Sequence, residues 1–296
     1  MAVHMTTYKD RPAVAVAGVG LTALLLPEDG GKMASLKSAS GQEYLCRDPG
    51  AAYRRLTPEG SYVEAECSAF DDMFPTIDPC TFENVPWAGV EYPDHGEVCR
   101  LPMQWKADER GITLTCPSRL FPTVFEKRVA PAEAGLRITY TLRNLGDVPF
   151  PCLWAGHIML AGEQDAVLAT PYPGDAPIRM MFGPENALDL PRDRLLPFGE
   201  EGPAYKFYYT QPLPKGEMAV SYPSRGEKLT LTVSEDVKYL GVWLNCGSFK
   251  GLYNLALEPC TALYDRPDAA LAAGCGYALP PGGERSFTLT FGCEKL

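Results

Sequence analysis

Two polar side chains suited to acid–base chemistry stand inside apolar runs of the sequence. His157, one of only three histidines, lies in the run FPCLWAGHIML, and Glu258 ends the run YNLALE just before a proline. Proline favours an extended backbone at the preceding residue, so Glu258 is held at the end of a strand. An imidazole titrates near neutrality, and a carboxyl group withdrawn from water has its pKa raised toward that range. The two residues could therefore serve as general acid and general base.

Each of these residues also has a plainer interpretation. Buried histidines are usually just hydrogen-bonded parts of a core, and a carboxylate at the end of a strand is usually solvated. A cysteine–histidine nucleophile would need Cys99 or Cys152 beside a histidine, whereas small buried thiols are the commoner case. Paired carboxylates for glycoside hydrolysis form another alternative, and the candidates for such a pair are Asp71, Asp72, Glu97 and Glu258.

Composition narrows the class of ligand. The 296 residues carry a net charge of −10, and the lysines and arginines occur singly or in pairs without forming a basic cluster, so we expect neither a nucleic-acid partner nor a membrane surface. The sequence contains no GxSxG, P-loop, GxGxxG or HExxH motif, and its ten cysteines show no CxxC spacing, so we expect no cofactor and no metal. A small neutral ligand is the easier partner; the oligomeric state stays open.

Residues 13–26 form an apolar stretch that could be mistaken for a secretory signal. Glycines interrupt it, no small-residue cleavage site follows, and it is too short to span a bilayer. We therefore read it as two short buried strands, and expect a cytoplasmic protein with reduced thiols.

An alternation of apolar and polar residues with a period of two predicts the strands that would position these groups. Apolar and polar residues alternate over 136–142, 229–233 and 287–291, as in half-buried antiparallel strands. No long helical pattern is present; 48–55 and 266–274 are candidates for short helices. The prediction is an all-β protein of large antiparallel sheets packed face to face, in one domain spanning 1–296 rather than two closely packed halves.

Two stretches of the sequence favour loops over regular strands. Residues 61–105 are rich in aromatic, acidic and proline residues and include Val85, and we interpret them as loops that form the site. Residues 171–204 are interpreted as an elaborate loop within the same sandwich, because the strand patterns on either side of them are alike.

Several short motifs, in order along most of the chain, resemble the aldose 1-epimerase (galactose mutarotase-like) family. They are LPEDGGKMASL with GQEYL near the beginning, FDDMFPTI, the pair His95-Gly96, LWAGH ending at His157, LGVWL, LEP with Asp265 shortly after, and LPPGGE before the final strand. Each motif is weak alone, and their order gives the resemblance its weight.

The resemblance implies the family's β-supersandwich fold and its activity, which interconverts the α and β anomers of an aldose. It implies that Glu258 is the general base and His157 the general acid, and that His95 binds sugar hydroxyls. Asp72 would accept a hydroxyl hydrogen bond, and Trp243 would form an apolar wall. The partner would be a small-molecule sugar, free or phosphorylated, and no cofactor would be needed. The alternatives are a non-catalytic carbohydrate-binding member of the same fold and a glycoside hydrolase or lyase sandwich.

The sequence departs from the family in the segment that precedes the His-Gly pair. The arginine- and asparagine-rich segment that typical galactose mutarotases carry before their His-Gly pair is missing, and residues 70–77 take its place. Members that act on phosphorylated sugars use arginines to bind phosphate, a role open here to Arg47, Arg100 and Lys106. The sequence leaves the sugar undefined.

Overall fold

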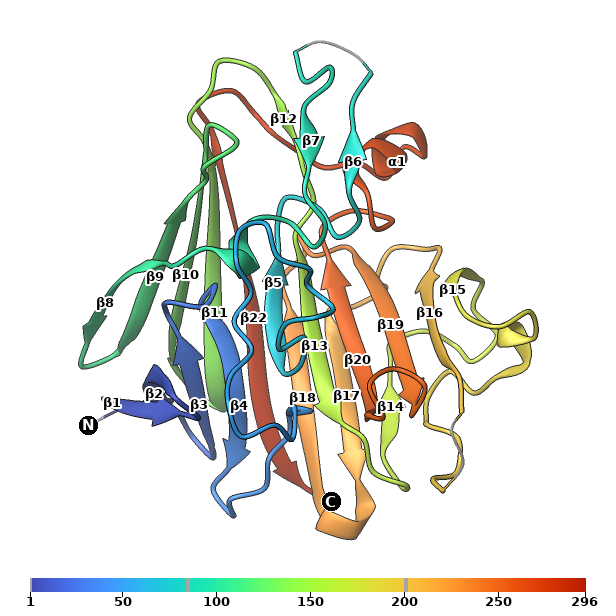
Figure 1. The fold of residues 1–296 in the computed structure, drawn as a ribbon. Helices are drawn as coiled ribbons and strands as arrows, with labels where there is room; N and C mark the ends of the chain where they lie inside the picture. Colours follow the sequence, from blue (N-terminus) through green and yellow to red (C-terminus); the bar gives the residue numbers. More distant parts are fainter. Residues whose placement is uncertain (1, 84–85, 200–201) are drawn as a thin grey trace.

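Two large antiparallel sheets pack face to face in the computed structural model, which describes residues 2–83, 86–199 and 202–296 and has ten strands in one sheet and eight in the other over those ranges (Figure 1). One continuous hydrophobic core draws residues from both sheets. The predicted all-β sandwich is confirmed.

The ten-stranded sheet holds all the candidate residues except His95, that is Asp72, His157, Trp243 and Glu258. In spatial order its strands are β1 (Val3–Tyr8), β2 (Arg11–Ala17), β3 (Leu21–Leu26), β4 (Lys32–Ser38), β5 (Phe70–Met73), β13 (Ala155–Ala161), β20 (Tyr253–Cys260), β19 (Tyr239–Cys246), β16 (Ala204–Tyr209) and β15 (Ile178–Phe182). The first five strands run in order along the chain, and β13 is inserted between β5 and β20. Segments from both ends of the chain therefore meet at the middle of this sheet.

The eight-stranded sheet closes the other side of the core. Its order is β14 (Val167–Ala169), β17 (Glu217–Tyr222), β18 (Glu227–Val233), β22 (Glu284–Lys295), β11 (Gly135–Asn144), β10 (Thr123–Ala132), β9 (Gly111–Pro117) and β8 (Gln104–Asp108). The predicted alternation holds in β11, where Leu136, Ile138, Tyr140 and Leu142 are fully buried and Arg137, between the first two, is exposed. Apolar side chains on one face of the strand supply this side of the core.

Short elements fill the connections. They are β6 (Cys80–Thr81), β7 (Glu91–Tyr92), β12 (Phe150–Pro151), β21 (Ala278–Leu279), the single helix α1 (Pro267–Ala272) of the described residues, and 3₁₀ turns at Val98–Arg100, Ala187–Asp189 and Pro223–Arg225. Helix α1 matches the candidate at 266–274. The candidate helix at 48–55 is wrong, because Asp48 accepts a hydrogen bond from the Gly50 amide at 2.8 Å and so forms a local turn instead.

The apolar run around His157 forms two strands, because the chain leaves β12 and the Trp154 amide donates to the Thr261 side chain at 2.9 Å before β13 begins. The stretch 61–105 is only partly irregular, since it contains β5, β6 and β7; its Val85 lies outside the described residues. No helix among the described residues is long and apolar enough to cross a bilayer.

Candidate functional site

One row of side chains crosses the middle of the ten-stranded sheet. His157 on β13 pairs with Asp71 on β5, and the register of β13 against β20 sets Glu258 opposite His157 on its other side. Glu258 in turn pairs with Gly241 on β19, and Gly241 pairs with Tyr208 on β16. Directly opposed residues of antiparallel strands project from the same face. The sheet therefore gathers an imidazole, two carboxylates and a phenol on one surface.

Gly241 allows the side chains on either side of it to approach one another. A Cβ atom at this position would lie 2.9 Å from the Tyr208 ring and 3.3 Å from the Cβ atom of Glu258. The first of these distances is a clash, so a larger residue would force Tyr208 away from the carboxylates. Glycine lets the neighbouring side chains meet over β19.

His157 and Glu258 of this row line a cavity of about 330 Å³. The polar residues that line it are Asp78, His95, His157, Lys206, Glu258 and Asp265, and the main apolar and aromatic ones are Tyr62, Ile77, Met159, Met181, Phe182, Trp243 and Phe249. A mostly apolar cavity with a few convergent polar groups is the usual form of a small-molecule site.

His157 and Glu258 face each other within this cavity. The His157 Nε2 atom lies 3.5 Å from Glu258 Oε1, and the Glu258 side chain is fully buried. Burial lowers the pKa of His157 well below its ordinary value of 6.5, and the nearby positive charge of Lys206 lowers it further. Burial raises the pKa of Glu258 above its ordinary value of 4.5, although Lys206 opposes the rise. The two shifts act to close the gap between the two pKa values, which eases proton exchange between the groups.

Lys206 on β16 is a charged partner that the sequence interpretation missed. Its Nζ atom lies 2.8 Å from Glu258 Oε2 and 2.8 Å from Asp265 Oδ1, and Tyr208 donates a hydrogen bond of 2.7 Å to the same Asp265 atom. Burial opposes the charge on Lys206, but the two carboxylates outweigh it and raise the pKa of the ammonium group. The available signal was a lone lysine in the otherwise apolar and aromatic strand AYKFYY.

His95 reaches the cavity from the loop after β7. Its ring stacks on that of Tyr62, with centroids 4.0 Å apart and planes 14° apart, and its centroid is 6.0 Å from that of His157. The Nδ1 atom lies 3.0 Å from the Asp94 carboxylate. At Gly96, which has a φ of 70°, a Cβ atom would lie 2.3 Å from the Phe74 carbonyl oxygen, so the His-Gly pair permits this tight turn.

Trp243 on β19 forms an aromatic wall of the cavity. Its ring stacks against Phe182 at 5.7 Å and meets the edge of Phe249 at 6.1 Å. Its indole N–H is buried and has no hydrogen-bond partner in the described part of the chain. The residue thus offers both an aromatic face and an unused donor. This position agrees with the expected apolar wall, whereas contact with a ligand stays a prediction.

The structure does not bring Asp72, the expected acceptor of a substrate hydroxyl, to the cavity, because its side chain projects from the other face of β5. Asp72 is 1% exposed and does not line the cavity. Its carboxylate accepts hydrogen bonds from Lys127 Nζ at 2.6 Å and from the Trp154 indole at 3.0 Å, between the sheets. Successive residues of a strand project from opposite faces. Asp71, one residue earlier, is therefore the aspartate on the site's face.

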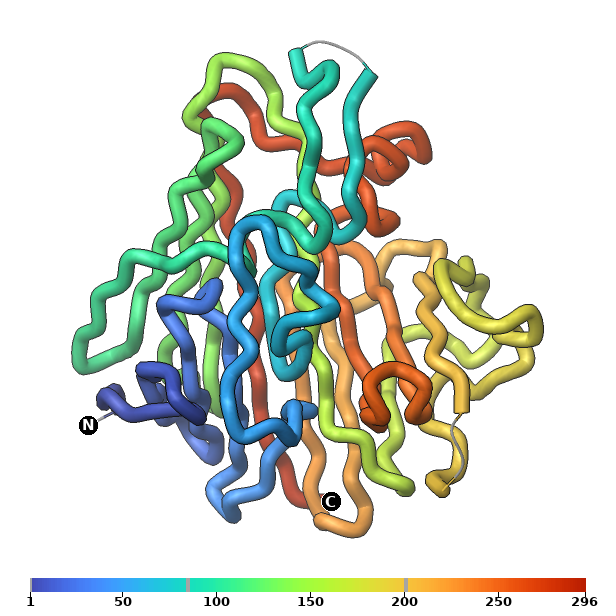
Figure 2. The backbone as a smooth tube through the Cα atoms, in the orientation of Figure 1, coloured from blue at the N-terminus to red at the C-terminus, as the bar shows by residue number. Residues whose placement is uncertain are grey.

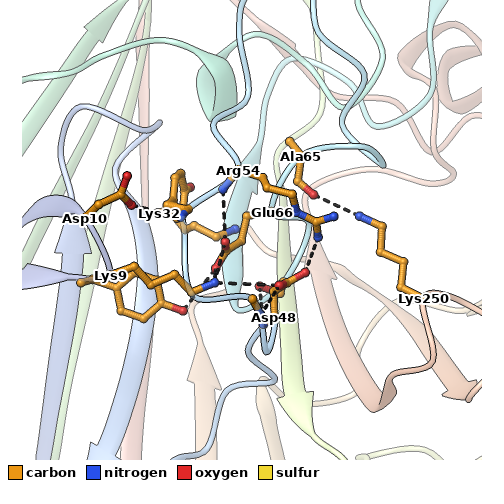
Figure 3. Close-up of polar contacts among 12 residues, drawn as sticks. Lys9, Asp10, Lys32, Asp48, Arg54, Ala65, Glu66 and Lys250 are labelled. Atoms are coloured by element: carbon orange, nitrogen blue, oxygen red, sulfur yellow. Dashed lines mark hydrogen bonds and ion pairs between the residues drawn. The ribbon is translucent and has the colours of Figure 1, made fainter.

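The loop that carries Tyr62 is held by polar contacts to two distant parts of the chain. Figure 2 shows residues 46–69 passing in front of β5, and Figure 3 shows the contacts that hold this segment. Lys9 Nζ lies 2.7 Å from the buried Glu66 carboxylate, and Lys250 Nζ donates a hydrogen bond of 3.0 Å to the Ala65 carbonyl oxygen. The loop is thereby joined to the first hairpin and to the β19–β20 connection.

The arginine and lysine candidates for a phosphate site lie elsewhere. Arg100 is buried and donates to backbone carbonyl oxygens of both the Tyr62 loop and the His95 turn, at Pro58 (2.8 Å), Gly60 (3.0 Å), Asp94 (2.6 Å) and Gly96 (3.0 Å). Arg47 and Lys106 do not line the cavity either. Arg100 therefore has a structural task, which is to hold Tyr62 beside His95. In the residues that the structure describes, no cluster of three or more His, Cys, Asp or Glu side chains could hold a metal ion.

Comparison with known proteins adds the fold. No family model matches the chain, and no curated protein matches it. Among solved structures, the Slr1438 protein from Synechocystis is 17% identical with a TM-score of 0.70 and coverage of 98% of this chain and 99% of that one. A galactose mutarotase-like protein from Clostridium acetobutylicum is 16% identical, with a TM-score of 0.68 and coverage of 99% and 98%. Another from Lactobacillus casei is 17% identical, with a TM-score of 0.64 and coverage of 95% and 100%. At these identities the likeness concerns architecture, and over almost its whole length the chain has the galactose mutarotase-like fold.

Proposed function

We propose that the protein is an aldose 1-epimerase that interconverts the α and β anomers of a sugar. The observation that carries this proposal is the approach of His157 Nε2 to Glu258 Oε1, at 3.5 Å, in a cavity with an aromatic wall. The anomeric oxygen and the ring oxygen of an aldose are bonded to the same carbon. A base and an acid that serve these two oxygens must therefore lie side by side, as the two groups do here.

The proposed reaction is a pair of coupled proton transfers. Glu258 takes the proton of the anomeric hydroxyl while His157 protonates the ring oxygen, and the C1–O5 bond breaks to give the open-chain aldehyde. Rotation about the C1–C2 bond presents the other face of the carbonyl group. The sugar then closes with the proton transfers reversed, so each group regains its starting state. The ammonium group of Lys206, 2.8 Å from Glu258, favours the carboxylate form that the base requires.

We propose that the substrate is a free aldose and carries no phosphate. The charged groups that line the cavity are Asp78, Glu258 and Asp265 on the negative side and Lys206 on the positive side. The ammonium group of Lys206 is already shared between two carboxylates at 2.8 Å each. A phosphate group would enter an excess of negative charge, with no further lysine or arginine lining the cavity among the described residues. His95 and the Trp243 wall would bind hydroxyl groups and an apolar sugar face.

Anomer conversion can be followed by polarimetry and NMR over a panel of free and phosphorylated aldoses. We expect the wild-type protein to accelerate conversion of a free aldose, and Glu258→Gln and His157→Asn each to reduce kcat by about 10²- to 10⁴-fold. Glu284→Gln, an exposed carboxylate on β22, is the matched control and should keep full activity. Conversion at the spontaneous rate with every sugar, or full activity in both folded variants, would refute the proposal. Sugar binding without acceleration would instead support a non-catalytic binding protein.

A further inference from the structure

A chain of polar contacts begins at the Nδ1 side of the His157 ring, which is the side turned away from Glu258. The His157 Nδ1 atom lies 3.3 Å from the Tyr62 hydroxyl oxygen, and that hydroxyl lies 3.0 Å from Asp71 Oδ2. Lys32 Nζ lies 2.5 Å from the same Asp71 atom. All four residues are at most 9% exposed. No motif of the sequence brings these groups together, and the proposed proton transfers do not by themselves require them.

The direction of the hydrogen bonds along this chain follows from the charge on Asp71. Asp71 forms an ion pair with the Lys32 ammonium group, and a carboxylate in an ion pair can only accept hydrogen bonds. The Tyr62 hydroxyl has a single proton, and a charged acceptor at 3.0 Å makes a stronger bond than a neutral nitrogen at 3.3 Å. The proton of Tyr62 therefore goes to Asp71. Its oxygen lone pairs are left facing His157, and only a protonated Nδ1 can complete the contact.

We propose that Tyr62, held by Asp71 and Lys32, is a positioning residue that fixes His157 in the tautomer with hydrogen on Nδ1. The Nε2 atom, 3.5 Å from Glu258, is then the only ring nitrogen that gains or loses a proton. His157 gives its proton from Nε2 and keeps the one on Nδ1. Without this control, neutral His157 could place its hydrogen on Nε2 and leave Nδ1 bare, so that no nitrogen facing the sugar could accept a proton.

The surroundings of Tyr62 hold it in place for this task. Its ring lies under that of His95, with centroids 4.0 Å apart, and Arg100 ties the Tyr62 loop to the His95 turn. Removing only the hydroxyl group would leave the ring stacking intact. Tyr62→Phe therefore tests the role of the hydroxyl group alone.

The tautomer can be measured directly by long-range ¹H–¹⁵N NMR of the full-length protein, without any sugar. The chain has three histidines, and the signals missing from His157→Asn identify those of His157. In the wild type at pH 7.5 we expect Nδ1 to give the signal of a protonated nitrogen and Nε2 that of a bare one. The opposite pattern would overturn the inference whether or not Tyr62→Phe folds.

In folded Tyr62→Phe we expect hydrogen on Nε2 to become populated, whereas an unchanged tautomer would show that Tyr62 does not set it. Tyr222→Phe is the control, because it also removes a buried hydroxyl, one that donates to the Ala161 carbonyl oxygen at 3.1 Å away from the cavity.

The kinetic consequence rests on the proposed function. We expect Tyr62→Phe to lower kcat by about 10- to 100-fold and to leave KM within about threefold, because proton transfer and not sugar binding is impaired. A loss confined to KM would contradict the positioning role. If the wild type converts no sugar, the proposed function fails, and the tautomer measurement still decides the inference.

Discussion

Replacing Lys206 with methionine tests how the buried charges of the site are balanced. The side chains of Lys206, Glu258 and Asp265 are 10%, 0% and 6% exposed, and each carboxylate lies 2.8 Å from the ammonium group. Methionine has a similar length but no charge, so Lys206→Met leaves two buried carboxylates without their cation. Removing one partner of a buried ion pair costs about 3–5 kcal/mol. We expect the free energy of unfolding at pH 8 to fall by that amount.

The loss in Lys206→Met should depend on pH in a defined direction. Lys206 opposes the rise in the pKa of Glu258, so without this cation the pKa of Glu258 in the folded protein lies further above that in the unfolded chain. A carboxyl group of this kind favours the folded state as the pH falls through its raised pKa, because the folded protein then binds more protons than the unfolded chain. Each unit by which a pKa is raised changes the free energy of unfolding by about 1.4 kcal/mol. The deficit at pH 5 should therefore be at least about 1.4 kcal/mol smaller than at pH 8.

Urea unfolding of the wild type and Lys206→Met at pH 5 and pH 8 gives both quantities. Lys228→Met is the matched control, because Lys228 makes a surface ion pair of 2.6 Å with Glu294 and the two side chains are 31% and 55% exposed. A surface pair contributes about 0–1 kcal/mol, so this variant should lose little stability at either pH. A deficit in Lys206→Met below about 1 kcal/mol at pH 8, or one that is equal at both pH values, would refute the reasoning.

Three further predictions concern the site. If His157 must be protonated to act as the acid, its lowered pKa places the alkaline limb of the kcat/KM profile below pH 6.5. The raised pKa of Glu258 places the acid limb above pH 4.5. An alkaline limb above pH 7 would contradict this prediction. Trp243→Ala should raise KM by about 3- to 10-fold through lost stacking, with little change in kcat, in the anomer-conversion assay. Asp72→Asn should lower stability by about 3–5 kcal/mol, measured by urea unfolding, because Lys127 loses its counterion; a rise in KM as large as that of Trp243→Ala would return Asp72 to the binding site.

The fold was accessible from the sequence because its main signals are local. The alternation over 136–142 is set by which residues of one strand face the core, and a neighbouring strand need not be known to see it. The expected helix at 48–55 failed for an equally local reason, since the Asp48 side chain serves a turn as readily as a helix cap. The break between the two strands at Trp154 depends on Thr261, more than a hundred residues away, and no local pattern predicts it.

The site was accessible only in part, because residue type is local whereas the facing direction and register of a strand are not. His157 and Glu258 stood out as rare ionisable groups in apolar runs. Nothing in the pair Asp71-Asp72 tells which aspartate faces the cavity, because a shift of one residue exchanges the two faces of a strand. Tyr62 was missed because its role depends on a loop that is tied to distant residues such as Arg100.

The same row explains why the predicted acid and base are accompanied by groups that the sequence did not single out. Asp71, His157 and Glu258 lie side by side on adjacent strands, so the imidazole has a carboxylate on each side. Two buried carboxylates cost too much unless each is paired with a cation, and Lys32 and Lys206 supply one to each. The two lysines are thus required by the register that brings His157 to Glu258. A change that shifts β13 against β20 by one residue should turn the His157 side chain away and remove its contact with Glu258, whereas the ion pairs Lys32–Asp71 and Lys206–Glu258 join other strands.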